Sequence, residues 1–219
     1  TDNLTSSDTI NGGGGTDILK LTNASTVIDA DFTNITNLDR IAQNTASHGM
    51  NLTLGSLAAA AGLITVTGGT GTNSVTIGSG YNGNLTVALA AGTDTIDGSG
   101  QTSGSLTVTA AQDSITTADT ITGGSATDTL TITGGGTALV AADLDKVTNF
   151  GTIRTATDAA FSFTTHENNA ANGVNVVFDA SSMTSANLTF NAAAETDGGI
   201  YTVIAGGGGD NITLGSGAD

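Results

Sequence analysis

Short segments of alternating apolar and polar residues run along most of the chain. Examples are "NLTLGSL", "SVTIGSG", "NLTVALAAG" and "DTLTITGG". Alternation with a period of two is typical of β-strands, because successive side chains point to opposite faces. The first apolar residues of these segments follow one another at short and fairly even intervals: Leu52, Ile64, Val75, Leu85, Ile96, Leu106, Ile115, Ile121 and Leu130.

Strands this short, evenly spaced and separated by Gly or Asn, are typical of a solenoid. We therefore predict an all-β fold, an elongated parallel β-solenoid or β-roll with short irregular or helical insertions. Two strands per turn give coils of roughly 18–22 residues. An antiparallel sandwich is the alternative, although it usually contains more aromatic residues than the 4% found here. Residues 56–62 and 137–147 are the candidate short helices.

A longer internal repeat is also visible. Residues 8–21 match residues 119–132 at an offset of 111, and residues 27–41 match residues 139–153 at an offset of 112. A module of glycine turn, strand, short helix or turn, and second strand is thus used twice. We divide the chain into a first solenoid module (1–118), a second (119–204) and the start of a third (205–219). We expect one continuous body that is a segment of a longer chain.

The first glycine run fits a nine-residue pattern. Residues 12–20, "GGGGTDILK", match G-G-x-G-x-D-x-U-x, where U is a large apolar residue. Glycines permit positive φ and can turn carbonyl oxygens towards a common point. The Asp adds a charged oxygen, and Ca²⁺ prefers such hard oxygen ligands. The apolar residue two places later is expected to point into the coil.

Three further units match this pattern in part. Residues 205–213 differ only at Ala205, residues 123–131 carry Ala126 in place of a glycine, and residues 68–76 carry Asn73 in place of the Asp. We expect the Asn73 turn, with Asn82 nine positions later, to form without a metal. At every unit the alternative is a bare tight turn. The candidate calcium ligands are Gly12, Gly14, Asp8, Asp17, Asp119, Gly124, Asp128, Gly206, Gly208, Asp210 and Asp219.

These units resemble the haemolysin-type calcium-binding nonapeptides of RTX proteins. Stretches such as "FDASSMTSANLTF" and "AADLDKVTNFGTI" resemble the RTX-containing surface-layer proteins of Gram-negative bacteria and related giant adhesins. The resemblance implies a parallel β-roll with Ca²⁺ between consecutive turns, type I export, and folding outside the cell. Family β-rolls carry long runs of units, whereas the units here stand in ones and twos. We therefore expect few calcium sites, each at a module junction.

The chain is strongly acidic, with 20 Asp and Glu against 4 Lys and Arg and a formal net charge of −16. No basic patch could neutralise phosphates, which argues against nucleic-acid binding. Acidic lipid headgroups would also be repelled. The acidity favours a hard cation as partner, or serves only solubility. There is no Cys, and no apolar stretch approaches the length of a transmembrane helix.

Candidate catalytic residues are few. His48 and His166 are the only histidines and lack the spacing of a zinc site. Glu167 and Glu195 are the only glutamates, and we expect both to be solvated loop residues. A carboxylate pair for glycoside cleavage stays open, because solenoid enzymes exist.

The sequence thus predicts a non-catalytic structural module of an extracellular, calcium-stabilised bacterial surface-layer or other self-assembling surface protein. The expected partners are other copies, in an oligomer, lattice or filament, and calcium ions, with surface polysaccharide as a further candidate. One alternative is the stalk or ligand-binding region of an RTX adhesin that binds glycan or a host surface, with Tyr81 and Tyr201 as candidate exposed aromatics. Another is a solenoid enzyme acting on polysaccharide.

Overall fold

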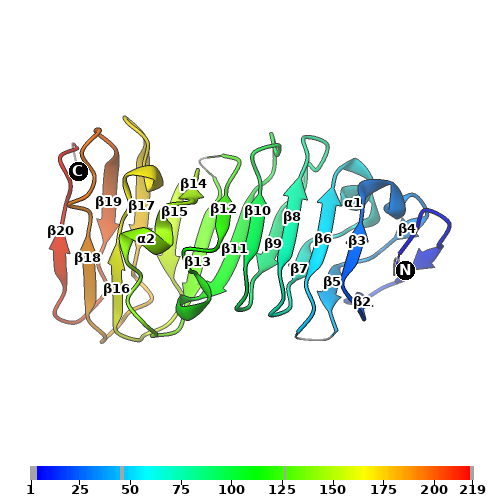
Figure 1. Ribbon diagram of the computed structural model, residues 1–219, viewed down its shortest axis with the longest axis horizontal. Coiled ribbons are helices and arrows are strands. Elements are labelled where there is room, and N and C mark those ends of the chain that lie inside the picture. The colour runs from blue at the N-terminus through cyan, green and yellow to red at the C-terminus, as the bar shows by residue number, and fades with distance from the viewer. Residues whose placement is uncertain (1–3, 45–46, 126, 218–219) are drawn as a thin grey trace.

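The chain forms an elongated parallel β-solenoid of about nine turns. The computed structural model describes residues 4–44, 47–125 and 127–217. The coils are stacked along one axis, and the two ends of the chain lie at opposite ends of the body (Figure 1). Neighbouring strands pair in parallel throughout the described residues, which confirms the solenoid and excludes the antiparallel sandwich.

The longest sheet contains one strand from each successive coil. Its nine strands, in spatial order, are β2 (Ile18–Leu21), β5 (Arg40–Gln43), β7 (Thr65–Thr67), β9 (Leu85–Ala88), β11 (Leu106–Ala111), β13 (Thr129–Thr133), β15 (Thr152–Thr155), β17 (Asn175–Asp179) and β19 (Ile200–Ile204). No break in pairing separates the predicted modules along this sheet. The body is therefore continuous, and the module boundaries stay a prediction.

Shorter sheets complete the coils. The six-stranded sheet contains β3 (Ser25–Val27), β6 (Met50–Leu54), β8 (Asn73–Ile77), β10 (Asp94–Asp97), β12 (Thr120–Thr122) and β14 (Val147–Thr148). The three-stranded sheet contains β16 (Phe161–Thr164), β18 (Leu188–Asn191) and β20 (Asn211–Thr213). The two-stranded sheet contains β1 (Ile10–Asn11) and β4 (Ile35–Thr36).

Apolar side chains are stacked in register through the interior. One column of the nine-stranded sheet contains Leu19, Ile41, Val66, Val87, Val108, Leu130, Ile153, Phe178 and Val203. The column passes from Leu19 to Val203 in eight steps. A coil therefore contains about 23 residues on average, slightly more than the roughly 18–22 residues expected for two strands per turn.

Two of the predicted strand positions were wrong. Ile64 is 52% exposed, whereas its neighbours Leu63 and Val66 are buried. The amides of Ile64 and Thr65 both donate to the carbonyl of Asp39, so two residues oppose one and the alternation shifts by one position. Ile115 is buried but is not in a strand, because it follows the 3-10 helix η2 (Gln112–Ser114).

The helical insertions are short. The prediction for 56–62 is confirmed by α1 (Ser56–Ala61), which ends at Gly62 with φ of 96°. The carboxylate of Asp29 accepts hydrogen bonds from the amides of Gly55 and Ala58 and so caps this helix. In 137–147 only α2 (Ala141–Leu144) is helical, because the chain enters β14 at Val147. Within the described residues, no helix has the length and apolar character needed to cross a membrane.

The internal repeat has a structural counterpart. Asn37 (φ 54°) and Asn149 (φ 60°) occupy equivalent positions of the two copies and are the non-glycine residues of the described chain with positive φ. The 3-10 helix η1 (Asp29–Phe32) occupies the position in the first copy that α2 occupies in the second. Each copy therefore contains a short helical segment and, after it, an Asn with positive φ at equivalent positions.

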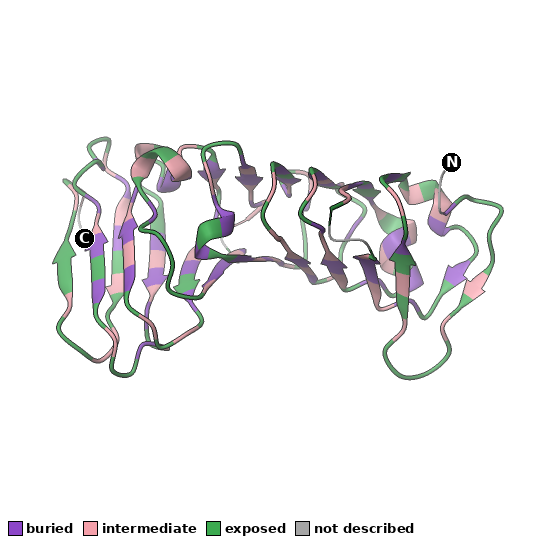
Figure 2. Ribbon diagram, turned by 60° about the horizontal axis from the view of Figure 1, so that its bottom comes forward, coloured by how far each residue is buried: buried purple, intermediate pink, exposed green. Residues whose placement is uncertain are grey.

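Aromatic side chains lie in the interior of the solenoid. Phe161, Phe163, Phe178, Phe190 and Tyr201 form a chain of ring contacts in the C-terminal coils, with centroids 4.8 to 6.3 Å apart. The remaining aromatic residues, Phe32, Tyr81 and Phe150, are also buried. Figure 2 shows buried positions alternating with less buried ones along the strands.

Candidate metal centre

The carboxylate of Asp128 lies inside its own glycine turn and is buried. Its Oδ2 accepts hydrogen bonds from the amides of Gly124 and Ser125, and its Oδ1 accepts one from the amide of Leu106, at 2.8 Å, in the preceding coil. Amide donors thus surround this carboxylate. The backbone of Gly124, a predicted calcium ligand, presents its N–H to Asp128.

Asp119 has the same kind of environment. Its Oδ2 accepts hydrogen bonds from the amide (2.8 Å) and hydroxyl (3.0 Å) of Thr116. Its Oδ1 accepts one at 2.7 Å from the amide of Asp94. Asp8, its counterpart in the first repeat, makes the two equivalent bonds to Thr5 but is exposed. Both copies of the repeat therefore contain a carboxylate that closes a local turn.

The first glycine run differs from the other turns. Asp17 is partly buried and its Oδ2 has no hydrogen-bond partner, while its amide donates to Oδ2 of Asp39 at 2.8 Å. Gly12 packs so closely that an added Cβ would lie 2.7 Å from the Asp17 side chain. Gly14, the other predicted ligand here, is exposed, and nothing lies within 4 Å of an added Cβ.

At the last glycine run, Asp210 Oδ1 accepts a hydrogen bond of 2.9 Å from the amide of Leu188. Gly206 is packed against the carbonyl of Met183, and Gly208 has a φ of 102° that supports the turn. The predicted partner Asp219 lies outside the described residues. The turn itself is confirmed, and its calcium ligation stays a prediction.

The Asn73 turn is closed by its own side chain. Asn73 Nδ2 donates to the carbonyls of Gly69 (2.8 Å) and Gly71 (3.0 Å) and to Oδ1 of Asp94 (2.7 Å). The amide nitrogen of a neutral side chain thus holds this turn, and the expectation that it forms without a metal stays a prediction. Asn82 is exposed.

Side chains of Asp link neighbouring coils at many places. Each of these carboxylates accepts a hydrogen bond from a backbone amide in a neighbouring coil. The amide of Asn73 donates to Asp94, and the amide of Thr137 donates to Asp113. At Asp158, hydrogen bonds from the hydroxyl of Thr184 and then the amides of Ser185 and Ala186 lower the pKa well below its usual range. These Asp side chains therefore accept hydrogen bonds from backbone amides of other coils, in addition to contributing negative charge.

One group of three carboxylates does gather. Among the described residues, Glu167, Glu195 and Asp197 form the one group of three or more metal-ligating side chains, and one oxygen from each lies within 4.8 Å of the others. We call these three residues the Glu195 cluster. Glu167 opens the 3-10 helix η3 (Glu167–Asn169), and the other two lie between β18 and β19 in the next coil.

The expectation that Glu195 is a solvated loop residue was wrong. Its side chain is buried, and the residue is 1% exposed. Oε1 accepts a hydrogen bond of 3.0 Å from the amide of Gly199, whereas Oε2 has no partner. Burial raises the pKa of Glu195 against the opposing hydrogen bond from the Gly199 amide. A side-chain hydrogen bond with Asp197 and the charges of Asp197 and Glu167 raise this pKa further. Glu167 and Glu195 are separated along the chain by little more than one coil, and this spacing was the one available signal in the sequence.

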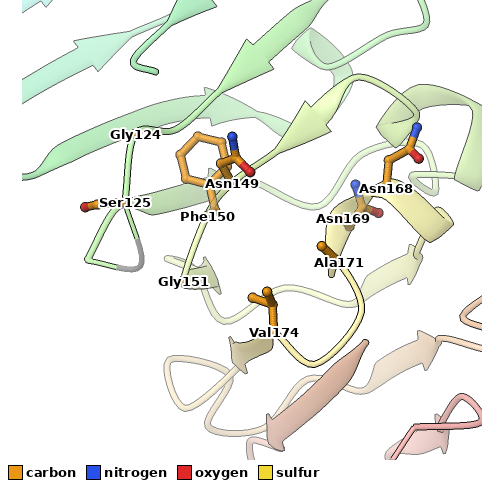
Figure 3. Close-up of a pocket in the computed structure, with 9 residues that line it drawn as sticks. All are labelled: Gly124, Ser125, Asn149, Phe150, Gly151, Asn168, Asn169, Ala171 and Val174. Atoms are coloured by element: carbon orange, nitrogen blue, oxygen red, sulfur yellow. The ribbon is translucent and has the colours of Figure 1, made fainter. Parts of the chain in front are cut away.

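A groove of about 330 Å³ lies near this region, between the glycine turn at Gly124 and the loop after η3. Figure 3 shows Asn149 and Phe150 on one side and Asn168, Ala171 and Val174 on the other. Asn169 in its wall is held by hydrogen bonds of 2.7 Å to the carbonyls of Leu144 and Val147. The groove contains amide and apolar groups, and its lining has no carboxylate.

The donor sets decide which place suits a hard cation. At Asp119 and Asp128 both carboxylate oxygens already accept hydrogen bonds, so ligation there would require these bonds to be exchanged. The Glu195 cluster instead offers three carboxylates and a buried oxygen without a donor. Its donors are the hard oxygens that Ca²⁺ prefers in proteins.

Comparisons with known proteins place no further constraint on these sites. No family model, no curated protein and no solved structure matches the chain.

Proposed function

We propose that the chain is a structural module of an extracellular, calcium-stabilised bacterial surface protein that self-assembles into a layer or filament. The observation that carries this proposal is the unbroken stack of coils, in which one sheet of nine parallel strands runs from β2 to β19. Such a stack works as a rod or spacer. Its strands offer the same hydrogen-bonding pattern at every level, so it can be extended by further coils.

Self-association enters the proposal through the resemblance to surface-layer proteins and adhesins. The stacked coils support it, because a body of repeated coils presents the same kind of surface at each level along its length.

Export and calcium enter the proposal through the resemblance of the glycine–aspartate units to RTX nonapeptides. The solenoid fold agrees with what that resemblance implies. The Glu195 cluster supports the calcium part of the proposal, because it gathers three carboxylates beside the glycine turn at Gly215. The glycan-binding alternative has lost its candidate residues, because Tyr81 and Tyr201 are both buried.

Analytical ultracentrifugation of the purified chain tests the proposal. We expect concentration-dependent assembly in calcium and a lower assembly state in chelator. A chain that stays monomeric in calcium at every concentration would contradict self-assembly.

A further inference from the structure

The Glu195 cluster joins two neighbouring coils. Glu167 comes from one coil, and Glu195 and Asp197 come from the next, about one turn later in the chain. Glu195 is buried, Glu167 is partly buried and Asp197 is exposed. The cluster therefore extends from the interior of the solenoid wall to solvent, and Asp197 marks the side from which a ligand can enter.

Nothing in the described part of the chain balances the charge of the cluster. Of its basic residues, Lys146 donates to the carbonyl of Thr117 and Arg154 donates to the hydroxyl of Thr131. His166, next to Glu167 in the chain, has its Nε2 3.6 Å from Oδ1 of Asp145, which is outside the cluster. Three like charges with oxygens this close repel one another, and burial of one of them adds a desolvation cost.

The buried oxygen at Glu195 points to a missing partner. Buried polar atoms are almost always hydrogen-bonded, so an unpartnered carboxylate oxygen requires an explanation. Oε2 is buried and has no donor, although Gly199 packs against it so closely that an added Cβ would lie 2.8 Å away. Hydrogen bonds satisfy other parts of the cluster. Thr196 Oγ1 donates to Glu167 at 2.9 and 3.1 Å, and the amide of Gly199 donates to Glu195 Oε1.

The donor set favours a hard cation. One oxygen from each of the three carboxylates lies within 4.8 Å of the others, which is compatible with calcium–oxygen bonds of about 2.4 Å. Calcium accepts irregular arrangements of oxygen ligands, whereas magnesium demands near-octahedral order.

We propose that Glu167, Glu195 and Asp197 form a calcium site that bridges two coils. The ion neutralises the three carboxylates and supplies the partner that Glu195 Oε2 lacks. Because the ion binds side chains of both coils, it links η3 to the connection between β18 and β19. The site lies beside the glycine turn at Gly215, where an added Cβ would be 2.7 Å from the Glu195 side chain. It forms within a single copy of the chain.

The site deepens the calcium part of the proposed function but does not depend on assembly. Its test is therefore made on the monomer, at concentrations below any association. A chain that binds calcium here without assembling would contradict the proposed function and leave the site intact.

Equilibrium dialysis with CaCl₂ and thermal melting test the site on wild type, Glu195→Gln, Glu167→Gln and Asp179→Asn. Asp179 lies in the same region of the solenoid but outside the cluster and provides the matched control. We expect Glu195→Gln to bind one calcium ion fewer per chain than wild type and to lose the calcium-induced rise in melting temperature. In chelator it should melt at or above the wild-type temperature, because it removes a buried charge. Asp179→Asn should bind calcium like wild type.

Glu167→Gln keeps the test decisive if the buried substitution perturbs folding, since Glu167 is only partly buried. It should weaken calcium binding by about tenfold or more, equivalent to about 1.4 kcal/mol. Equal stoichiometry and affinity in wild type and both glutamine variants would overturn the proposal. So would a wild-type chain that binds no calcium at millimolar concentration, which would indicate that protons alone neutralise the cluster.

Discussion

Asn73 and Asp94 lie opposite each other on β8 and β10, and the carboxylate of Asp94 accepts two hydrogen bonds from Asn73. The donors are the backbone amide, at 3.0 Å, and Nδ2, at 2.7 Å. Both bonds reach Oδ1, so Oδ2 of this fully buried residue has no partner. The amide of Asp94 in turn donates to Asp119. A column of polar side chains therefore runs through the wall of the solenoid and connects three coils.

The first prediction concerns pH. Burial raises the pKa of Asp94 to about 6, against the opposing effect of the Asn73 hydrogen bonds. Because the folded state binds this proton more tightly than the unfolded state, its contribution to stability rises as pH falls from about 7 to about 4. We expect Asp94→Asn to remove a gain on the order of 1–3 kcal/mol over this range in urea denaturation.

The quantity compared is the difference in unfolding free energy between wild type and Asp94→Asn at each pH. This difference is needed because the pKa of Glu195 is also raised, so Glu195 changes stability with pH in the same direction in both proteins. Thr95→Ala, at an exposed position of the same strand without a titrating group, should keep the wild-type slope. An unchanged slope in Asp94→Asn would show that Asp94 does not carry the effect.

The second prediction concerns the glycine–aspartate turn. Asp128→Ala leaves the amides of Leu106, Gly124 and Ser125 without their acceptor in a buried site. We expect a loss of about 2–4 kcal/mol in the free energy of unfolding, measured in chelator. Asp8→Ala, at an exposed turn, should cost less than about 1 kcal/mol. Similar losses in the two variants would argue against the buried amide bonds as the reason.

The third prediction concerns close backbone contact in the repeat. A Cβ at Gly123 would lie 2.3 Å from the carbonyl oxygen of Asn149, so Gly123→Ala must displace backbone. We expect it to destabilise the chain by about 2 kcal/mol or more. Gly14→Ala has open space and should stay within about 0.5 kcal/mol of wild type. Both are read from thermal and urea unfolding, and a tolerated Gly123→Ala would contradict the packing.

The fourth prediction tests the shifted register at β7. Leu63 is buried and Ile64 is half exposed, although the two are neighbours in the chain. Leu63→Ala should cost about 2–5 kcal/mol by leaving a cavity, and Ile64→Ala less than about 1 kcal/mol. A larger loss for Ile64→Ala than for Leu63→Ala would contradict the shifted register and favour the register expected from the sequence alone.

The sequence predicted the solenoid because alternation and spacing are properties of each short segment. Leu52, Val75, Ile96 and Leu130 occupy buried strand positions as expected. Coil length and local register were harder to predict, since they depend on contacts with the neighbouring coil. Ile64 shows this, because the carbonyl of Asp39, a whole coil earlier, accepts from two amides and shifts the alternation.

The candidate site was harder to predict than the fold. The glycine–aspartate units draw attention to Asp17 and Asp128 by their composition, and the structure places both in turns that start strands. What the pattern does not reveal is the donor that faces each carboxylate. Glu167 and Glu195 carry no local motif, and their meeting depends on a coil length that the sequence does not state.

Electron microscopy of the wild-type chain in calcium and in chelator tests the proposed function most directly. We predict ordered filaments or sheets built from rods in calcium, and dispersed single rods after chelation. Single rods in both conditions, at concentrations well above those used for the binding experiments, would contradict a self-assembling, calcium-stabilised structural module.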